Sequence, residues 1–282
     1  MSISILNNIP ALAAQNQLSI TQANLQSTLF QLSSGSRINS GADDAAGLAI
    51  ANGMQANITA LNQSSQNAND GVGELQVADG ALSQVTNLLN RAVTLATEAS
   101  NGTVTATQQT ALDNEFSKIK TEIDNIGSNT TFNGSNVFTA STTSIFLSDS
   151  NSSYQIGVTV GALSASSIQG GSTSGLAAVD LSTDSLTSAS SAQTALTDIN
   201  NAIVNVASKR GEVGATINQL QSAGNVISTQ VQNLTSAENG ITAADIPAEV
   251  GKLSSDNILN QTGISALAQA NSAQQAVLRL LQ

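Results

Sequence analysis

The residues with the clearest capacity for chemistry are the adjacent carboxylates Asp43 and Asp44, in the glycine-bearing segment SGADDAAGLAI at 40–50. Two carboxylates could bind a cation or act as an acid and a base, but sequence neighbours at the start of a helix do not face each other. A phosphate-binding loop would need GxGxxG or GxxxxGK spacing after a strand, and this segment has neither. The order of residues therefore favours helix capping by Asp43 or Asp44.

The composition removes most other catalytic and metal-binding side chains. Histidine and cysteine are absent from the 282 residues, which excludes the commonest base, the commonest metal ligand and the thiol nucleophile. A disulfide framework and a thiolate metal site are excluded for the same reason. We therefore expect no catalytic residue, no metal site and no cofactor, and a protein that is not an enzyme.

The charge pattern argues against nucleic acid and membranes as partners. The formal net charge is −11, and the eight basic residues form no cluster larger than a pair, whereas binding to phosphates or to anionic lipids needs clustered cations. No apolar run reaches the roughly 18 residues of a membrane span. The first ten residues, MSISILNNIP, also lack the basic region followed by an apolar region of a Sec signal.

Apolar residues at heptad spacing predict two helices in the first hundred residues. The first helix carries leucines at seven-residue intervals and should end at Gly35–Gly41, where the backbone is permissive. The second should run over 45–99 for roughly 80 Å. It should continue through Gly71 and Gly73, because the heptad keeps its phase across both glycines. Its heptad positions are Met54, Leu61, Ala68, Leu75, Leu82, Leu89 and Ala96.

Three further helices follow from spacings of three and four residues. A short one covers 105–127, and a long one carries an apolar seam from Leu196 to Leu234. The last begins after Asp245, a candidate cap, with Pro247 in its first turn. This last helix is rich in alanine and only weakly amphipathic, so that in water it should be partly unfolded on its own.

The centre of the chain has a different composition. The segments 131–139, with Asn-Gly turn chemistry, and 154–160, with alternating apolar residues, predict short strands. Residues 161–192 are rich in Ser, Gly and Thr and predict a loop with some irregular strand. The fold class expected is mainly α: a long antiparallel coiled-coil-like helical rod with a small β-hairpin region, and a terminal domain of paired N- and C-terminal helices.

Four motifs resemble bacterial flagellin, the flagellar filament subunit: LSSGSRINSGADDAAGLAIA (32–51), TFNGSNVF (131–138), NLTSA (233–237) and ILNQTGISALAQANSAQQAVLRLLQ (258–282). The resemblance implies a terminal domain of 1–43 and 243–282 that forms the filament's inner core. It implies a helical-rod domain of 44–242, with the β-region and Ser/Gly/Thr-rich segment at about 131–192. The resemblance further implies that this chain lacks the family's outer domains.

The resemblance also implies a function. A flagellin-like chain polymerises with copies of itself into the extracellular filament used for motility, after type III export as an unfolded chain. Its partners would be the flagellar cap, the hook-associated proteins and an export chaperone that binds the C-terminal segment. Flagellins are sometimes O-glycosylated in an exposed tract such as 140–192, and an unmodified loop is an equal alternative.

Other functions stay open on the sequence alone. A hook–filament junction protein shares the terminal motifs, although the ending AQANSAQQAVLRLLQ looks more like that of flagellin. A soluble coiled-coil adaptor or a non-flagellar extracellular adhesion module would also use apolar heptads. These last two would form discrete oligomers rather than a growing polymer.

A receptor site is also implied by the resemblance. Flagellins that the innate immune receptor TLR5 detects carry an Arg and a Leu one turn apart, and a Glu on the next helix. The matching positions are Arg91, Leu95 and Glu115, and we expect them to be exposed on the monomer and covered in the filament. The family's usual acidic residue before the Leu is Thr94 here. The alternative is that all three are ordinary subunit contacts.

The heptad patterns and the resemblance together predict which residues lie at helix interfaces. For the subunit-assembly helices these are Leu18, Leu25, Leu29, Leu32, Ile264, Leu267, Val277 and Leu281. For the rod core they are Leu61, Leu75, Leu82, Leu89, Phe116, Ile119, Ile203, Val206, Ile217, Leu220, Ile227 and Val231.

Overall fold

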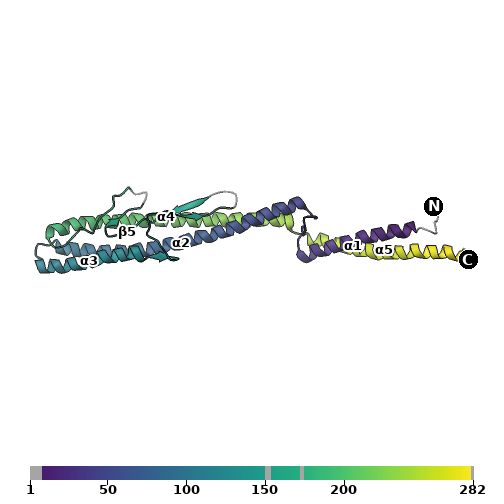
Figure 1. Ribbon diagram of the computed structural model, residues 1–282, viewed down its shortest axis with the longest axis horizontal. Coiled ribbons are helices and arrows are strands. Elements are labelled where there is room, and N and C mark those ends of the chain that lie inside the picture. The colour runs from purple at the N-terminus through teal and green to yellow at the C-terminus, as the bar shows by residue number, and fades with distance from the viewer. Residues whose placement is uncertain (1–7, 150–153, 172–174, 281–282) are drawn as a thin grey trace. The chain divides into compact units, whose positions relative to one another are not determined.

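The computed structural model describes residues 8–149, 154–171 and 175–280. Its five described helices are α1 (Ile9–Ser34), α2 (Ala45–Ala99), α3 (Ala106–Asn129), α4 (Ala189–Thr242) and α5 (Ile246–Leu280) (Figure 1). The expected mainly α fold is confirmed, and α2 begins and ends where the heptad pattern predicted.

The chain forms two compact units. Unit 1 combines Met1–Ala56 with Asn233–Gln282, and unit 2 is Asn57–Gln232. Unit 1 is therefore built from both ends of the sequence, as the terminal motifs predict. The expected functional division into 1–43 with 243–282 and 44–242 stays a prediction.

The two adjacent aspartates have separate structural roles. Asp44 Oδ1 accepts a hydrogen bond from the Gly47 amide at 2.8 Å, which caps the start of α2. Asp43 Oδ2 accepts from the amides of Asn39 and Ser40 at 3.0 and 2.8 Å. These bonds, the one from the Asn39 amide above all, lower the pKa of Asp43. One carboxylate thus caps the helix while the other fixes the loop before it.

Helices α2, α3 and α4 enclose the core of unit 2. Most predicted core residues are buried: Leu61, Leu75, Leu82, Leu89, Phe116, Ile119, Val206, Leu220 and Ile227. Ile203, Ile217 and Val231 are only half-buried, so their assignment to the core is corrected. Ala195, Ala202, Asn205 and Lys209 are buried on α4 instead.

The apolar seam of α4 is flanked by further buried positions because described residues of the central segment also cover this helix. Asn205 Nδ2 donates to the carbonyl oxygens of Ile168 and Ala177, both at 2.9 Å, and Lys209 Nζ donates to that of Ala162 at 3.1 Å. Helix α4 therefore buries a wider face than the single stripe read from its apolar residues.

The described residues of the central segment form three antiparallel strand pairs. These are β1 (Thr131–Phe132) with β2 (Ser135–Asn136), β3 (Thr143–Phe146) with β4 (Gln155–Val158), and β5 (Leu163–Ser164) with β6 (Ser167–Ile168). In the first turn Asn133 and Gly134 both have positive φ, 47° and 80°, as a two-residue hairpin requires. The two predicted strand segments are confirmed.

The expectation of a loop over 161–192 is only partly right. Its apolar side chains Leu163, Ile168, Leu181 and Leu186 are buried, and α4 already begins at Ala189. Helix α3 holds this segment through three polar side chains. Asp124 Oδ1 accepts from the Ala165 amide at 2.8 Å, Asp113 Oδ1 accepts from the Leu186 amide at 2.7 Å, and Lys120 Nζ donates to the Asp184 carbonyl at 2.7 Å.

Two glycines are points at which the β segments approach the helices closely. A Cβ on Gly71 of α2 would overlap Ile145 Cδ1 of β3, and a Cβ on Gly127 of α3 would overlap the carbonyl oxygen of Leu163 in β5. Helix α2 nevertheless continues through Gly71 and Gly73, as predicted. The helical cost of these glycines, about 1 kcal/mol each, is offset by the packing that a missing side chain allows.

Candidate functional site

The first candidate surface is the pair of helices α1 and α5 in unit 1, which lie side by side (Figure 1). Their contacts run in antiparallel order. Asn8 Nδ2 donates to the Ala270 carbonyl at 3.3 Å, and Leu18 packs against Gly263. At the other end of α1, the Ala244 amide, which precedes α5, donates to the carbonyl of Gly35 at 3.0 Å.

The pair leaves much of its apolar surface uncovered. Leu18, Leu25, Leu32 and Leu267 are half-buried, whereas Leu29 and Ile264 are exposed. Leu281 lies outside the described residues, as does the side chain of Val277. The buried positions of α1 are Thr21 and Thr28. Among the side chains that the structure describes, the exposed large apolar ones on the two helices are Ile9, Leu12, Ile20, Leu29, Phe30, Ile246, Val250, Ile258, Leu259 and Ile264.

The exposed apolar side chains on α1 and α5 limit the stability that the helix pair gains from burial. A helix in a two-helix pair can bury only one face, and apolar residues on the remaining faces stay in water. Phe30 is 71% exposed, although burying such a side chain fully is worth about 1.5–3 kcal/mol. The pair therefore gains only part of the stability that its apolar side chains could supply.

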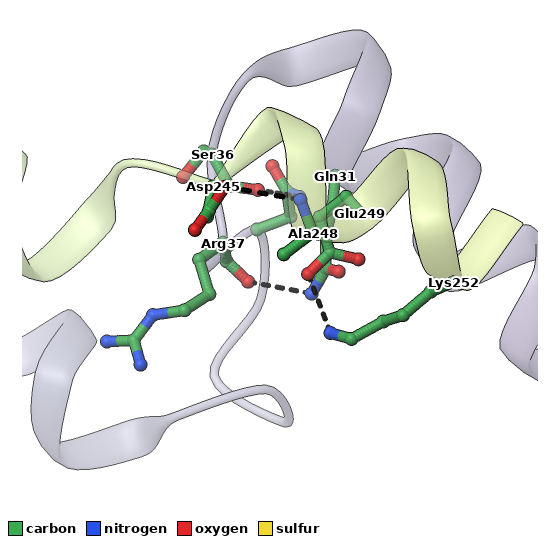
Figure 2. A network of polar contacts seen from close by, with 8 residues as sticks. Gln31, Ser36, Arg37, Asp245, Ala248, Glu249 and Lys252 are labelled. Carbon is green, nitrogen blue, oxygen red and sulfur yellow. Dashed lines mark hydrogen bonds and ion pairs between the residues drawn. The ribbon is translucent and has the colours of Figure 1, made fainter.

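The end of α1 is linked to the start of α5 by a network of polar contacts, called here the polar joint, that includes Gln31, Ser36, Arg37 and Glu249 (Figure 2). The Arg37 amide donates to the Thr242 carbonyl at 2.7 Å, Ser36 Oγ donates to the same carbonyl at 3.1 Å, and Gln31 Nε2 donates to the Arg37 carbonyl at 3.0 Å. These bonds satisfy backbone groups where two helices end. They fix the path of the chain between α1 and α2.

Glu249 is the buried charge of this joint. Its side chain is 8% exposed, and its Oε1 pairs with Lys252 Nζ at 2.7 Å. Its Oε2 is buried without a hydrogen-bond partner in the described part of the chain, and the guanidinium of Arg37 points away from it in Figure 2. The position in the first turn of α5 favours a negative charge through the helix dipole.

The second candidate surface is the predicted trio on unit 2. Arg91 Nε of α2 and Glu115 Oε1 of α3 form an exposed ion pair at 2.7 Å. The Glu115 hydrogen bond raises the pKa of Arg91, and the same bond lowers the pKa of Glu115. Leu95, however, is only 1% exposed, so the expectation that all three residues are exposed on the monomer is wrong.

The burial of Leu95 follows from helix geometry. Residues four apart differ by about 40° around the axis, which is enough to place Arg91 at the edge of α2 and Leu95 under it. Leu95 also shares its face with Ala92 and Ala99, at spacings of three and four, and both are fully buried. Two residues on the same side of a helix can therefore differ in burial, and their spacing does not establish that both are exposed.

Lys209 is a buried cation that the sequence analysis did not identify. It is 3% exposed, and burial lowers its pKa from 10.5 to about 8, an effect that the charge of Glu212 opposes. Its sequence signal is its position: Lys209 lies three residues after Val206 and four before Val213, inside the apolar seam of α4. A lysine at that spacing predicts a buried ammonium group.

Neither a metal-binding cluster nor a membrane-spanning helix is found among the described residues. In the ranges 8–149, 154–171 and 175–280, no group of three or more Asp and Glu side chains is arranged to hold a metal ion. None of the helices in the same ranges combines the length and the apolar character that crossing a bilayer requires.

Comparison with known proteins gives strong similarity along the chain. The family model described as the bacterial flagellin N-terminal helical region matches residues 5–143, and that of the bacterial flagellin C-terminal helical region matches 196–281. Flagellin of Halalkalibacterium halodurans is 36% identical over 285 residues, with 99% of each chain covered. Flagellin of Bacillus subtilis is 34% identical over 305 residues, again with 99% of each chain covered.

Among solved structures, the crystal structure of Bacillus cereus flagellin is 30% identical to this chain. The match covers 61% of this chain and 94% of that one, with a TM-score of 0.47.

Proposed function

Because the chain belongs to the bacterial flagellin family, it is a structural subunit of the flagellar filament, and we propose that unit 1 supplies the contacts of its inner core. The observation that carries this proposal is the exposed apolar surface on both α1 and α5. Copies of the same helix pair, packed side by side, would cover these faces. The pair would then become fully ordered on assembly, because ordering entropy is offset by the new burial.

Point substitutions test this assignment. Ile20→Ser and Phe30→Ser remove exposed apolar side chains of α1, so the double variant should keep the helical content of the monomer and lose seeded filament growth. Gln22→Ser, at an exposed polar position of the same helix, is the matched control and should polymerise normally. Growth of the double variant at the wild-type rate, followed by light scattering and electron microscopy, would show that α1 is not an assembly surface.

Truncation gives a second, independent test. Removal of residues 1–30 or 255–282 eliminates most of α1 or of α5 and leaves unit 2 intact. Such chains should remain soluble and fail to extend filament fragments. Long straight filaments formed by either truncated chain with wild-type efficiency would refute the inner-core assignment.

The remaining partners are proposed from the family alone. The subunit would leave the cell by type III export as an unfolded chain, with a chaperone on the C-terminal segment. Its partners outside the cell would be the flagellar cap and the hook-associated proteins. The lack of any cysteine suits this route, since no disulfide must open for passage. Binding of an export chaperone to the full chain and not to a chain without 255–282 would support this proposal. The family is structural, and we propose no catalytic activity.

We also propose that TLR5 recognises monomers through Arg91 and Glu115, with Leu95 supporting them from below. The exposed ion pair at 2.7 Å supports this surface, and bonds to charged groups are among the stronger polar contacts of an interface. Arg91→Ala should weaken binding of the monomer to the receptor ectodomain, whereas Lys118→Ala, an exposed cation on α3, should not. Equal weakening by both variants, or no binding by the wild-type monomer, would refute this proposal.

A junction-protein role is not favoured. Matches extend over 99% of flagellins of similar length, which is the pattern expected of a filament subunit. An adaptor or adhesion module would require discrete oligomers, and the light-scattering experiment above distinguishes them from a growing polymer.

A further inference from the structure

Four Asn-Gly dipeptides occur in the chain, at 52–53, 101–102, 133–134 and 239–240. Asn-Gly is the dipeptide in which an asparagine amide is most open to attack by the following backbone nitrogen, because glycine has no side chain in the way. The first and last of these pairs lie inside α2 and α4, and the other two lie in turns. The chain thus presents one reactive dipeptide in distinct backbone settings.

The reaction needs a free amide and a close side chain. The Gly nitrogen, after loss of its proton, attacks Cγ of the asparagine. A C–N bond forms, ammonia leaves, and a five-membered imide remains. Water then opens the imide at either carbonyl, which yields aspartate or isoaspartate. In a helix the Gly N–H is held by the carbonyl four residues before it, so Asn52 and Asn239 are protected.

Asn101 is in the most favourable setting. Asn101 and Gly102 are both exposed in the turn between α2 and α3, and Asn101 Oδ1 accepts a hydrogen bond from the Thr103 amide at 3.2 Å. This bond folds the side chain back over the backbone of residue 102 and polarises the carbonyl that is attacked. The Gly102 amide makes no hydrogen bond within the described ranges.

Asn133 has the same dipeptide in a more restricted turn. Asn133 and Gly134 have φ values of 47° and 80°, and the pairs Phe132–Ser135 and Thr131–Asn136 close the hairpin directly around them. A turn closed by a strand pair resists the backbone rotation that ring closure requires. Helices rather than paired strands flank the turn at 100–105, which is held across Gly102 by a backbone bond from the Val104 amide to the Asn101 carbonyl at 3.1 Å and not by a strand pair.

We propose that Asn101 is a site of spontaneous deamidation in the folded protein, which converts it to aspartate and isoaspartate. The product places a new carboxylate just beyond the C-terminal end of α2, three residues from Glu98. Negative charge is disfavoured at that end of a helix, so the turn between α2 and α3 loosens as the protein ages.

The test uses the full chain, incubated as native monomer and in urea at mildly alkaline pH, followed by peptide mapping with mass spectrometry and isoaspartyl methyltransferase labelling. In the native protein Asn101 should convert roughly tenfold faster than Asn52 and Asn239, a ratio that needs only a modest difference in activation barrier. It should also convert faster than Asn133. In urea all four rates should converge, because the intrinsic chemistry is the same.

Gly102→Ala is the variant that tests the mechanism. A Cβ there meets nothing within 4 Å and Gly102 does not have positive φ, so the variant folds, and its conversion at Asn101 should slow several-fold in both native protein and urea. Conversion of Asn101 in native protein as slow as that of Asn52 would overturn the proposal. Unchanged conversion in Gly102→Ala would do so as well.

Discussion

Gly127 is the position at which an added methyl group tests the docking of the central segment most sharply. It is buried near the end of α3, and a Cβ built there overlaps the carbonyl oxygen of Leu163 and lies 2.9 Å from its carbonyl carbon. Backbone atoms cannot rotate away as a side chain can. Gly127→Ala must therefore push β5 off α3.

The expected change in the free energy of unfolding of Gly127→Ala combines two destabilising contributions and one stabilising contribution. Overpacking of this kind costs about 1–3 kcal/mol. Displacement of β5 also weakens the bond from the Ala165 amide to Asp124 Oδ1, at 2.8 Å, and a hydrogen bond to a charged group is worth about 1.5–3 kcal/mol. Replacing glycine by alanine in a helix increases the free energy of unfolding by up to about 1 kcal/mol. The free energy of unfolding should fall by about 2–4 kcal/mol.

Gly80→Ala is the matched control. Gly80 is exposed in α2, and a Cβ there meets nothing within 4 Å, so this variant should be more stable than wild type by about 0.5–1 kcal/mol. Urea unfolding of the monomeric chain, followed by circular dichroism, measures both changes. If Gly127→Ala were as stable as Gly80→Ala, the close approach of β5 to α3 would be wrong.

Three further predictions concern burial and capping. Because the unfolded chain keeps the proton of Lys209 up to about pH 10.5 while the folded chain releases it at about 8, stability should rise between these values, by about 3 kcal/mol in total. Titration of Lys209→Met should lack this rise, and an equal rise in both proteins would assign it elsewhere. Leu220→Ala should cost about 2–5 kcal/mol in urea unfolding because Leu220 is fully buried. Half-buried Ile217 should lose clearly less on the same change, and equal losses would contradict the orientation of α4. Asp44→Ala removes the cap of α2 and should lower the free energy of unfolding by about 1 kcal/mol, with no change in melting temperature as the contrary result.

Local residue patterns were sufficient to predict the helices and the family. Heptad phase carried α2 through Gly71 and Gly73, Asp44 and Asp245 marked helix starts, and Asn133–Gly134 marked a hairpin. These signals are local: a cap, a turn or a periodic stripe depends on residues a few positions apart. They can be recognised in the sequence without knowledge of the tertiary fold.

The covered face of each helix could not be predicted in this way, because it depends on packing between distant segments. Described residues of the segment 161–188 pack on α3 and α4 through Asp113, Asp124 and Lys209, which widens the buried face of α4 to include Asn205 and Lys209. The same step placed Leu95 inside unit 2 while Arg91 stayed outside. Periodicity gives the direction of a side chain around its own helix, but burial depends on the neighbour that lies there, and that neighbour can come from a distant part of the chain.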